Sequence, residues 1–240
     1  MTLLTTEIVV EPQPIIVFAA DRRISKNDQR DSDRRKIFQV PTKRRACIGY
    51  FGLAEVPVGG RQPYMDEWLP DFLNARTALP TLGDLAKALE QELNRLVPAA
   101  TRRSVTSGFH LAGFNEYDEP EFWFVRNVGD DLTTILGSYA TREDFQRRDR
   151  ANLPAGAVQI YRNGDLRAHV AVWESIDTSF GALLGLRDFA LAAGPVQRMQ
   201  WVKFKMEAIA QFYQRFCHAS IIGKPIDAFV ITLSGVEAAD

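Results

Sequence analysis

Two apolar, strand-like stretches around a Pro-Gln-Pro turn make up residues 5–21, TTEIVVEPQPIIVFAAD. This pattern is typical of an antiparallel β-hairpin, in which the position of the turn determines which residues face each other. With Gln13 at the centre of the turn, Thr5 is predicted to lie across the ladder from Asp21. The hairpin would then place a hydroxyl beside a carboxylate at its open end.

Short motifs beyond the hairpin give the chain a family resemblance. The order TTEIVV, IIVFAADRR, DRRKIF and CIGYFG resembles the start of 20S proteasome β subunits and of their bacterial relatives, the HslV-type peptidases and Anbu. Further on, LAGFN is similar to the family's next core strand, and IIGKPIDAFVIT is similar to its terminal segment. The resemblance covers roughly residues 5–138 and 196–235. It implies an N-terminal nucleophile hydrolase that cleaves peptide or amide bonds with a threonine and assembles into a homo-oligomer of one or more rings.

The resemblance also implies roles for single residues. Thr5 falls on the family's nucleophilic threonine, and Asp21 falls on the aspartate that follows sixteen residues later. Lys36 falls on the lysine that opens the third strand, and Arg23 matches the arginine two residues after the aspartate.

Supporting parts of the family's site have weaker counterparts. Gly52 in CIGYFG matches the glycine whose backbone N–H binds the oxyanion, with Gly49 as the alternative. Ser138 resembles the supporting serine that follows the fifth core strand. The second supporting aspartate and serine are not cleanly present before the terminal strand, where Ser220 is the nearest candidate.

The chemistry of these residue types agrees with such roles. A threonine hydroxyl is a weak nucleophile that needs a base within hydrogen-bonding distance. An N-terminal α-amine, with a pKa near ~8, can be that base. A Lys36 ammonium held by Asp21 lowers the pKa of the hydroxyl and of the amine, and a glycine lets the backbone approach the oxyanion closely. Taken singly, Thr5 is also an ordinary strand residue, Asp21 a strand end and Lys36 an exposed cation.

The residues before Thr5 leave two functions open. The segment MTLL must be removed to free the α-amine of Thr5, and self-cleaving members of the family usually carry Gly in place of Leu before the threonine. Removal of Met1 alone exposes Thr2, which the predicted register puts roughly 10 Å along the strand from the position across from Asp21. The alternative to a hydrolase is therefore an unprocessed, inactive structural or regulatory protein on the same scaffold.

The order of elements predicts an α+β fold in a single domain of residues 1–240. Strands are predicted at 8–10, 15–20, 37–40, 46–51, 108–114, 121–126, 133–137 and 226–233, and helices at 64–76, 82–97 and 196–216. Thr81 is predicted to cap the second helix. This order fits a four-layer αββα sandwich, two stacked sheets with helices outside each, which the resemblance also implies. Trp68 and Phe72 of the first helix are candidates for the core or for contacts between subunits.

A stretch of about residues 140–195 departs from the family's pattern. Residues 158–161 and 166–173 flank an Asn-Gly turn and predict an extra, inserted hairpin, followed by a helix over about 177–193. The preferred interpretation is an elaboration that packs at a subunit contact or covers the edge of the cleft; a separate binding function is the alternative.

Composition excludes several other classes of protein. The net charge of −1 supplies no basic field for nucleic acid, so the basic runs at 33–36 and 43–45 are interpreted as solvated strand ends, with a basic binding module as a third hypothesis. No apolar run approaches the ~18 residues that span a membrane, and no signal peptide is evident. Cys47 and Cys217 predict free thiols in the reducing cytoplasm. The scattered residues His110, His169 and His218 predict neither a metal site nor a cofactor.

Overall fold

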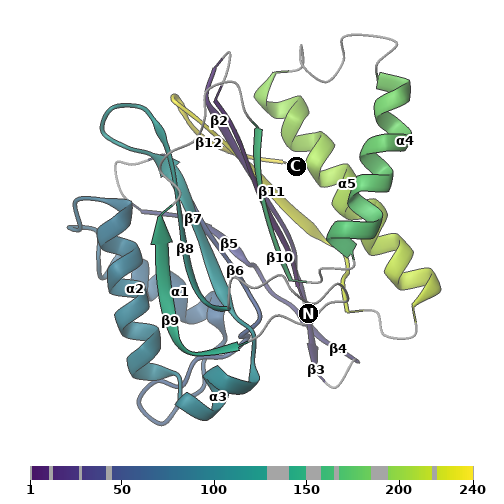
Figure 1. Cartoon of the computed structure of the whole chain (residues 1–240). Helices are drawn as coiled ribbons and strands as arrows, with labels where there is room; N and C mark the ends of the chain where they lie inside the picture. The colour runs from purple at the N-terminus through teal and green to yellow at the C-terminus, as the bar shows by residue number, and fades with distance from the viewer. Residues whose placement is uncertain are drawn as a thin grey trace.

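The computed structural model describes residues 2–10, 13–26, 29–41, 45–128, 141–149, 158–164, 168–184, 194–217 and 221–239. Within these residues, antiparallel strands form two five-stranded sheets and one two-stranded ribbon. The two large sheets lie face to face, and helices lie on the outer side of each (Figure 1).

The first sheet contains both ends of the described chain. Its strand order is β10-β1-β2-β11-β12. The strands are β1 (Leu3–Val9), β2 (Ile15–Asp21), β10 (Val158–Gly164), β11 (Ile226–Thr232) and β12 (Gly235–Ala238). Strand β1 is therefore paired on both sides, by β2 and by β10.

The second sheet has the order β5-β6-β7-β8-β9. Its strands are β5 (Ile37–Gln39), β6 (Ala46–Phe51), β7 (Gly108–Phe114), β8 (Pro120–Val128) and β9 (Thr141–Asp149). The two-stranded ribbon of β3 (Arg23–Lys26) and β4 (Gln29–Asp33) connects β2 of the first sheet to β5 of the second.

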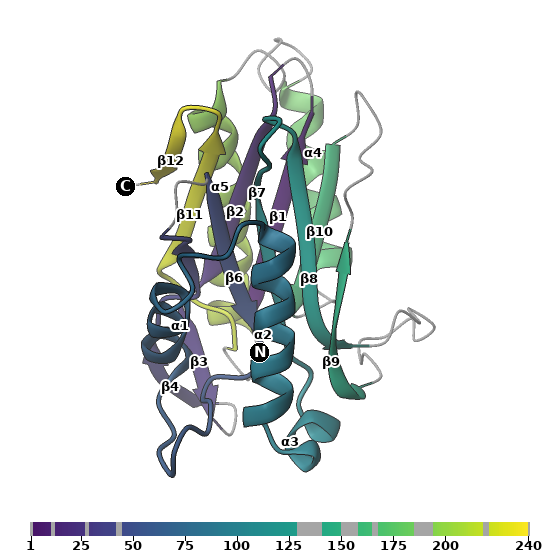
Figure 2. The same ribbon diagram turned by 90° about the vertical axis from the view of Figure 1, so that its left-hand side faces the viewer.

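The helices divide between the two sheets. Helices α1 (Met65–Asn74), α2 (Leu82–Leu96) and the short α3 (Ala99–Ser104) follow β6, and α2 runs across the outer face of the second sheet (Figure 2). A π-helical turn, η1 (Ala168–Trp173), leads into α4 (Glu174–Leu184), and α5 (Pro195–Phe216) packs against β2 and β11. The Thr81 hydroxyl accepts a hydrogen bond from the Asp84 N–H, which confirms the predicted cap of α2.

Three apolar clusters hold these layers together. Strands β1 and β2 are buried on both faces, so alternate side chains enter different clusters. Leu4, Phe18 and Ile37 belong to the cluster between the sheets, whereas Leu3 and Val17 pack toward α5. The third cluster lies between the second sheet and helices α1 and α2, and it includes Trp68 and Phe72, which are 8% and 3% exposed and therefore serve the core.

The register of the first hairpin differs from the prediction. Thr5 faces Ala19 and Leu4 faces Ala20, so the prediction that Thr5 lies across from Asp21 is wrong. The difference is a shift of two residues, which keeps every side chain on the same face of the sheet. Because side chains alternate with a period of two, the apolar pattern fits both registers equally well.

The prediction of an inserted hairpin is also wrong in part. Strand β10 does form at the predicted place, but it pairs with β1, and residues 168–173 are helical. The free edge of β1 supplies a long-range partner, which satisfies the backbone of β10 without a second local strand. Helix α4 begins at Glu174, and the predicted strand at 133–137 lies outside the described residues.

Several short elements were not expected. Strand β9 is highly charged, TREDFQRRD, and buries only Phe145 deeply, so no alternating pattern marks it.

Among the described residues, no helix combines the length and apolarity required to cross a bilayer.

Candidate active site

A buried ion pair joins two of the residues singled out from the sequence. The Lys36 ammonium donates to Asp21 Oδ1 at 3.1 Å and to the carbonyl oxygen of Arg23 at 2.6 Å. Neither the Lys36 nor the Asp21 side chain is exposed at all. Asp21 Oδ1 also accepts a hydrogen bond from the backbone N–H of Leu3 at 2.8 Å, so β1 begins at this pair.

The backbone on both sides of the pair is firmly held. Asp21 is the last residue of β2, and Lys36 immediately precedes β5, where its carbonyl accepts the Tyr50 N–H of β6. After Asp21, the Arg22 side chain makes a bidentate ion pair with Asp227 at the start of β11, at 2.8 and 2.9 Å from Nε. The ion pair thereby ties the end of β2 to the start of β11 beside the buried pair, a contact that the sequence did not indicate.

Burial decides the electrostatics of Lys36. Removal from water lowers the pKa of the Lys36 ammonium below its ordinary value, and the negative charge of Asp21 opposes that shift. A lysine with a lowered pKa can change its charge nearer to neutral pH than an exposed lysine can. Such groups are concentrated at functional sites.

Thr5 is not brought to this pair. Its hydroxyl is completely buried, and Thr5 Oγ1 has no hydrogen-bond partner among the described residues. Thr5 shares a face of β1 with Leu3, which packs toward α5, and with Glu7, which pairs with Arg198 of α5 at 3.0 Å. The hydroxyl therefore lies on the helix side of the first sheet, opposite Ala19.

Thr2 occupies the end of β1 beside the pair. It directly precedes Leu3, whose N–H binds Asp21, and it is 4% exposed. Continuing the alternation of β1 puts Thr2 on the same side as Leu4, which packs with Ile37 between the sheets. The predicted register, wrong by two residues, placed Thr2 too far from Asp21; the signal that could have indicated it was the threonine at position 2.

Gly52 lies at the same end of the molecule. It follows β6 one residue after Phe51 and has a φ of 86°, a conformation that favours glycine. A Cβ atom there would come within 2.0 Å of the Thr106 carbonyl oxygen, so no side chain fits. Gly49, in contrast, lies inside β6, paired with both β5 and β7, and its missing side chain makes room for Leu4.

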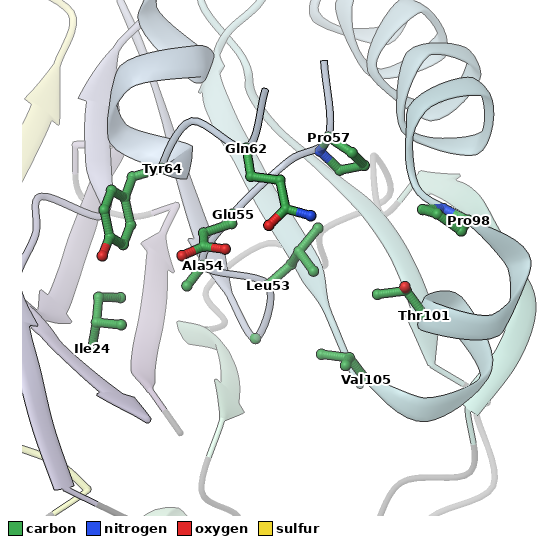
Figure 3. Close-up of a pocket in the computed structure, with 11 residues that line it drawn as sticks. Ile24, Leu53, Ala54, Glu55, Pro57, Gln62, Tyr64, Pro98, Thr101 and Val105 are labelled. Atoms are coloured by element: carbon green, nitrogen blue, oxygen red, sulfur yellow. The ribbon is translucent and has the colours of Figure 1, made fainter. Parts of the chain in front are cut away.

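A pocket of about 360 Å³ opens beside Gly52. Its walls come from Ile24 of β3, from the loop between β6 and α1, and from residues around α3 (Figure 3). Ile24, one of its lining residues, directly follows Arg23, whose carbonyl accepts from the Lys36 ammonium. The arrangement therefore combines a buried charge pair, a strand end carrying a threonine, a glycine loop and a cavity.

Other residues named from the sequence do not join this group. Ser138 and Ser220 lie outside the described residues. The His110 ring forms hydrogen bonds through both nitrogens: Nδ1 lies 2.9 Å from the Thr6 hydroxyl, and Nε2 lies 2.6 Å from Asn163 Oδ1. This buried network links β7 to β1 and β10. Across the described part of the chain, no group of three or more His, Cys, Asp or Glu residues could hold a metal ion.

Among solved structures, the chain is similar to "Anbu (ancestral beta-subunit) from Yersinia bercovieri", with a TM-score of 0.55 and 11% sequence identity over 99% of this chain and 86% of that chain. The fold is proteasome-like. At this identity the likeness concerns the fold alone. No protein-family model and no curated protein matches the sequence.

Proposed function

We propose that the chain is a threonine-type N-terminal nucleophile hydrolase that cleaves peptide or amide bonds, with Thr2 in place of Thr5 as the nucleophile. The observation that carries this proposal is the meeting of the Leu3 N–H, Asp21 and Lys36 at the end of β1, one residue from Thr2. The scaffold is a single-domain four-layer αββα sandwich, a proposal supported by the two facing sheets with helices outside each.

Cleavage of the Met1–Thr2 bond would give Thr2 a free α-amine, the base that its hydroxyl needs. The hydroxyl attacks the substrate carbonyl while its proton passes to this amine. The positive charge of Lys36, held by Asp21, lowers the pKa of the hydroxyl, which favours loss of its proton, and lowers the pKa of the amine, which keeps the amine unprotonated and able to accept. The backbone N–H of Gly52 stabilises the tetrahedral oxyanion.

Collapse of this intermediate breaks the C–N bond. The proton on the α-amine leaves with the amine product, and an ester joins the acyl group to Thr2. Water then attacks the ester, the α-amine takes and returns one proton, and the acid product departs. Each turnover thus consumes one water and restores the hydroxyl.

An inactive scaffold is the second candidate function. The observation that favours it is the burial of Thr2, which is only 4% exposed in the full chain. A chain that retained Met1 would keep the amine of Thr2 in a peptide bond and would lack the base.

Intact mass and covalent labelling separate these functions. The hydrolase should lack Met1 and should gain the mass of an electrophile that reacts with both the amine and the hydroxyl of an N-terminal threonine. Thr2→Ala should abolish labelling and peptide turnover, whereas Thr5→Ala should keep both. A protein that retains Met1, resists labelling and cleaves no peptide would be the scaffold, and activity lost with Thr5→Ala alone would return the role to Thr5.

A further inference from the structure

One wall of the pocket beside Gly52 carries a carboxylate. Glu55 and Gln62 both come from the loop between β6 and α1, and their side chains lie near each other in the cavity (Figure 3). The lining is otherwise largely apolar and includes Ile24, Leu53 and Val105. A single acidic group in such surroundings is unusual for a site that accepts only apolar side chains.

The Glu55 carboxylate has no ion-pair or hydrogen-bond partner among the described residues. Arg34 and Arg102, two cations on neighbouring segments, are engaged elsewhere. Arg34 stacks on Tyr64 with its charge centre 3.8 Å from the ring and pairs with Glu67 at 3.0 Å. Arg102 of α3 pairs with Asp144 at 3.0 Å and also donates to backbone carbonyl groups. Glu55 is half-buried, so water screens its negative charge only in part.

We propose that Glu55 makes this pocket select a lysine or arginine side chain in the residue whose carbonyl is attacked. The inference rests on the proposed hydrolase and names its substrate class. Lysine and arginine combine an apolar stem with a charged head, which matches an apolar cavity that ends in a carboxylate. Gln62 and Thr101 line the same pocket and offer further acceptors for a guanidinium group. Gly52 also lines it, so a side chain held there keeps its carbonyl beside the proposed oxyanion donor.

A set of fluorogenic peptides that differ only in the residue before the cleaved bond tests this selection. Peptides with Arg or Lys should give a kcat/KM at least about tenfold above those with Leu, Gln or Glu, the effect of one charge-assisted hydrogen bond. Glu55→Gln should reduce the Arg-to-Leu ratio by about the same factor, and Glu55→Lys should favour the Glu peptide. The matched control is Glu116→Gln, which removes an exposed carboxylate beyond the opposite end of β7 and should leave the ratio unchanged.

Binding measured without turnover separates this inference from the proposed function. In Thr2→Ala, a labelled Arg peptide should bind more tightly than its Leu twin by fluorescence anisotropy, and adding Glu55→Gln should remove the difference. Equal binding of the two peptides, or an Arg preference that survives Glu55→Gln, overturns the role of Glu55 even if the native chain cleaves peptides. Selective binding without any turnover or labelling would support the role of Glu55 and would contradict the proposed hydrolase activity.

Discussion

Asp21 and Lys36 are expected to depend strongly on each other. Both side chains are completely buried, and the Lys36 ammonium has two acceptors, Asp21 Oδ1 and the Arg23 carbonyl. A buried pair of this kind contributes little net stability when intact, but removal of one partner leaves a charge without compensation. Asp21 also holds the Leu3 N–H, so its loss would release the end of β1.

Asp21→Asn should therefore lower both activity and stability. We expect the free energy of unfolding to fall by about 3–5 kcal/mol and peptide turnover to drop below detection. Urea unfolding followed by circular dichroism gives the first value, and a fluorogenic peptide gives the second. As a control, Asp71→Asn removes an exposed carboxylate from α1 and should change neither. A stable and active Asp21→Asn protein would contradict the role given to the pair.

The activity should have a bell-shaped dependence on pH. Below the pKa of the Thr2 α-amine, which the charge of Lys36 lowers from its ordinary value of about 8, the amine is protonated and cannot accept the hydroxyl proton, so kcat/KM rises as the pH rises. Because burial lowers the pKa of Lys36, its positive charge is lost below the pH at which an ordinary lysine titrates, and kcat/KM falls again on that side. A pH series on a peptide substrate, with circular dichroism to verify folding at each pH, measures both limbs. A rate that stays constant from pH 6 to 10 would argue against both groups.

Strand β10 acts on the site through its pairing with β1. Leu3 faces Gly164 in this ladder, and Gly164 has a φ of 108°. A Cβ atom at Gly164 would lie 1.6 Å from the Thr2 carbonyl oxygen, so the two backbones meet at the place where the proposed nucleophile sits. The segment that departs from the family's pattern thus supports Thr2 directly.

Gly164→Ala should displace Thr2 and strain the backbone at once. We expect a loss of about 1–3 kcal/mol in unfolding free energy and a larger relative loss of kcat than of substrate affinity. Gly60→Ala is the matched control, since Gly60 has a φ of 81° but nothing within 4 Å of the added carbon, so it reports the backbone strain alone. Equal activity of the two variants would show that β10 does not position Thr2.

A ring assembly, which the sequence resemblance implies, requires a surface at which copies meet. Trp68 and Phe72 are buried in the core and are not available for this. Helix α5 instead exposes Phe204, Phe212 and Phe216 on its outer side, at 43%, 46% and 73%. Exposed aromatic residues on one helix are typical of an interaction surface.

Light scattering should therefore give a mass well above the 27.0 kDa of one chain. The double variant Phe204→Gln and Phe212→Gln should shift the mass toward that of a monomer, with little change in unfolding at low concentration. Tyr117→Gln, which changes a residue that is 75% exposed in the turn before β8, should leave assembly intact. A wild-type chain that is monomeric at micromolar concentration would contradict the ring.

Local patterns determined a large part of this fold. The apolar runs of β1 and β2, the cap at Thr81 and the helical spacing of α2 and α5 each specify their element within a few residues. The motifs around Asp21 and Lys36 likewise indicated two side chains that do meet in a buried pair.

Only the tertiary structure decided the register and the partners of these strands. A shift of two residues preserves every face of a β-strand, so the sequence pattern could not tell whether Thr5 or Leu3 lies across from Asp21. The pairing of β10 with β1 joins segments that are 149 to 161 residues apart and follows from which strand edge is free in three dimensions. Thr2 and Glu55 acquire their proposed roles in the same way, because the contact of β1 with Asp21 and the walls of a pocket form only when distant segments pack together.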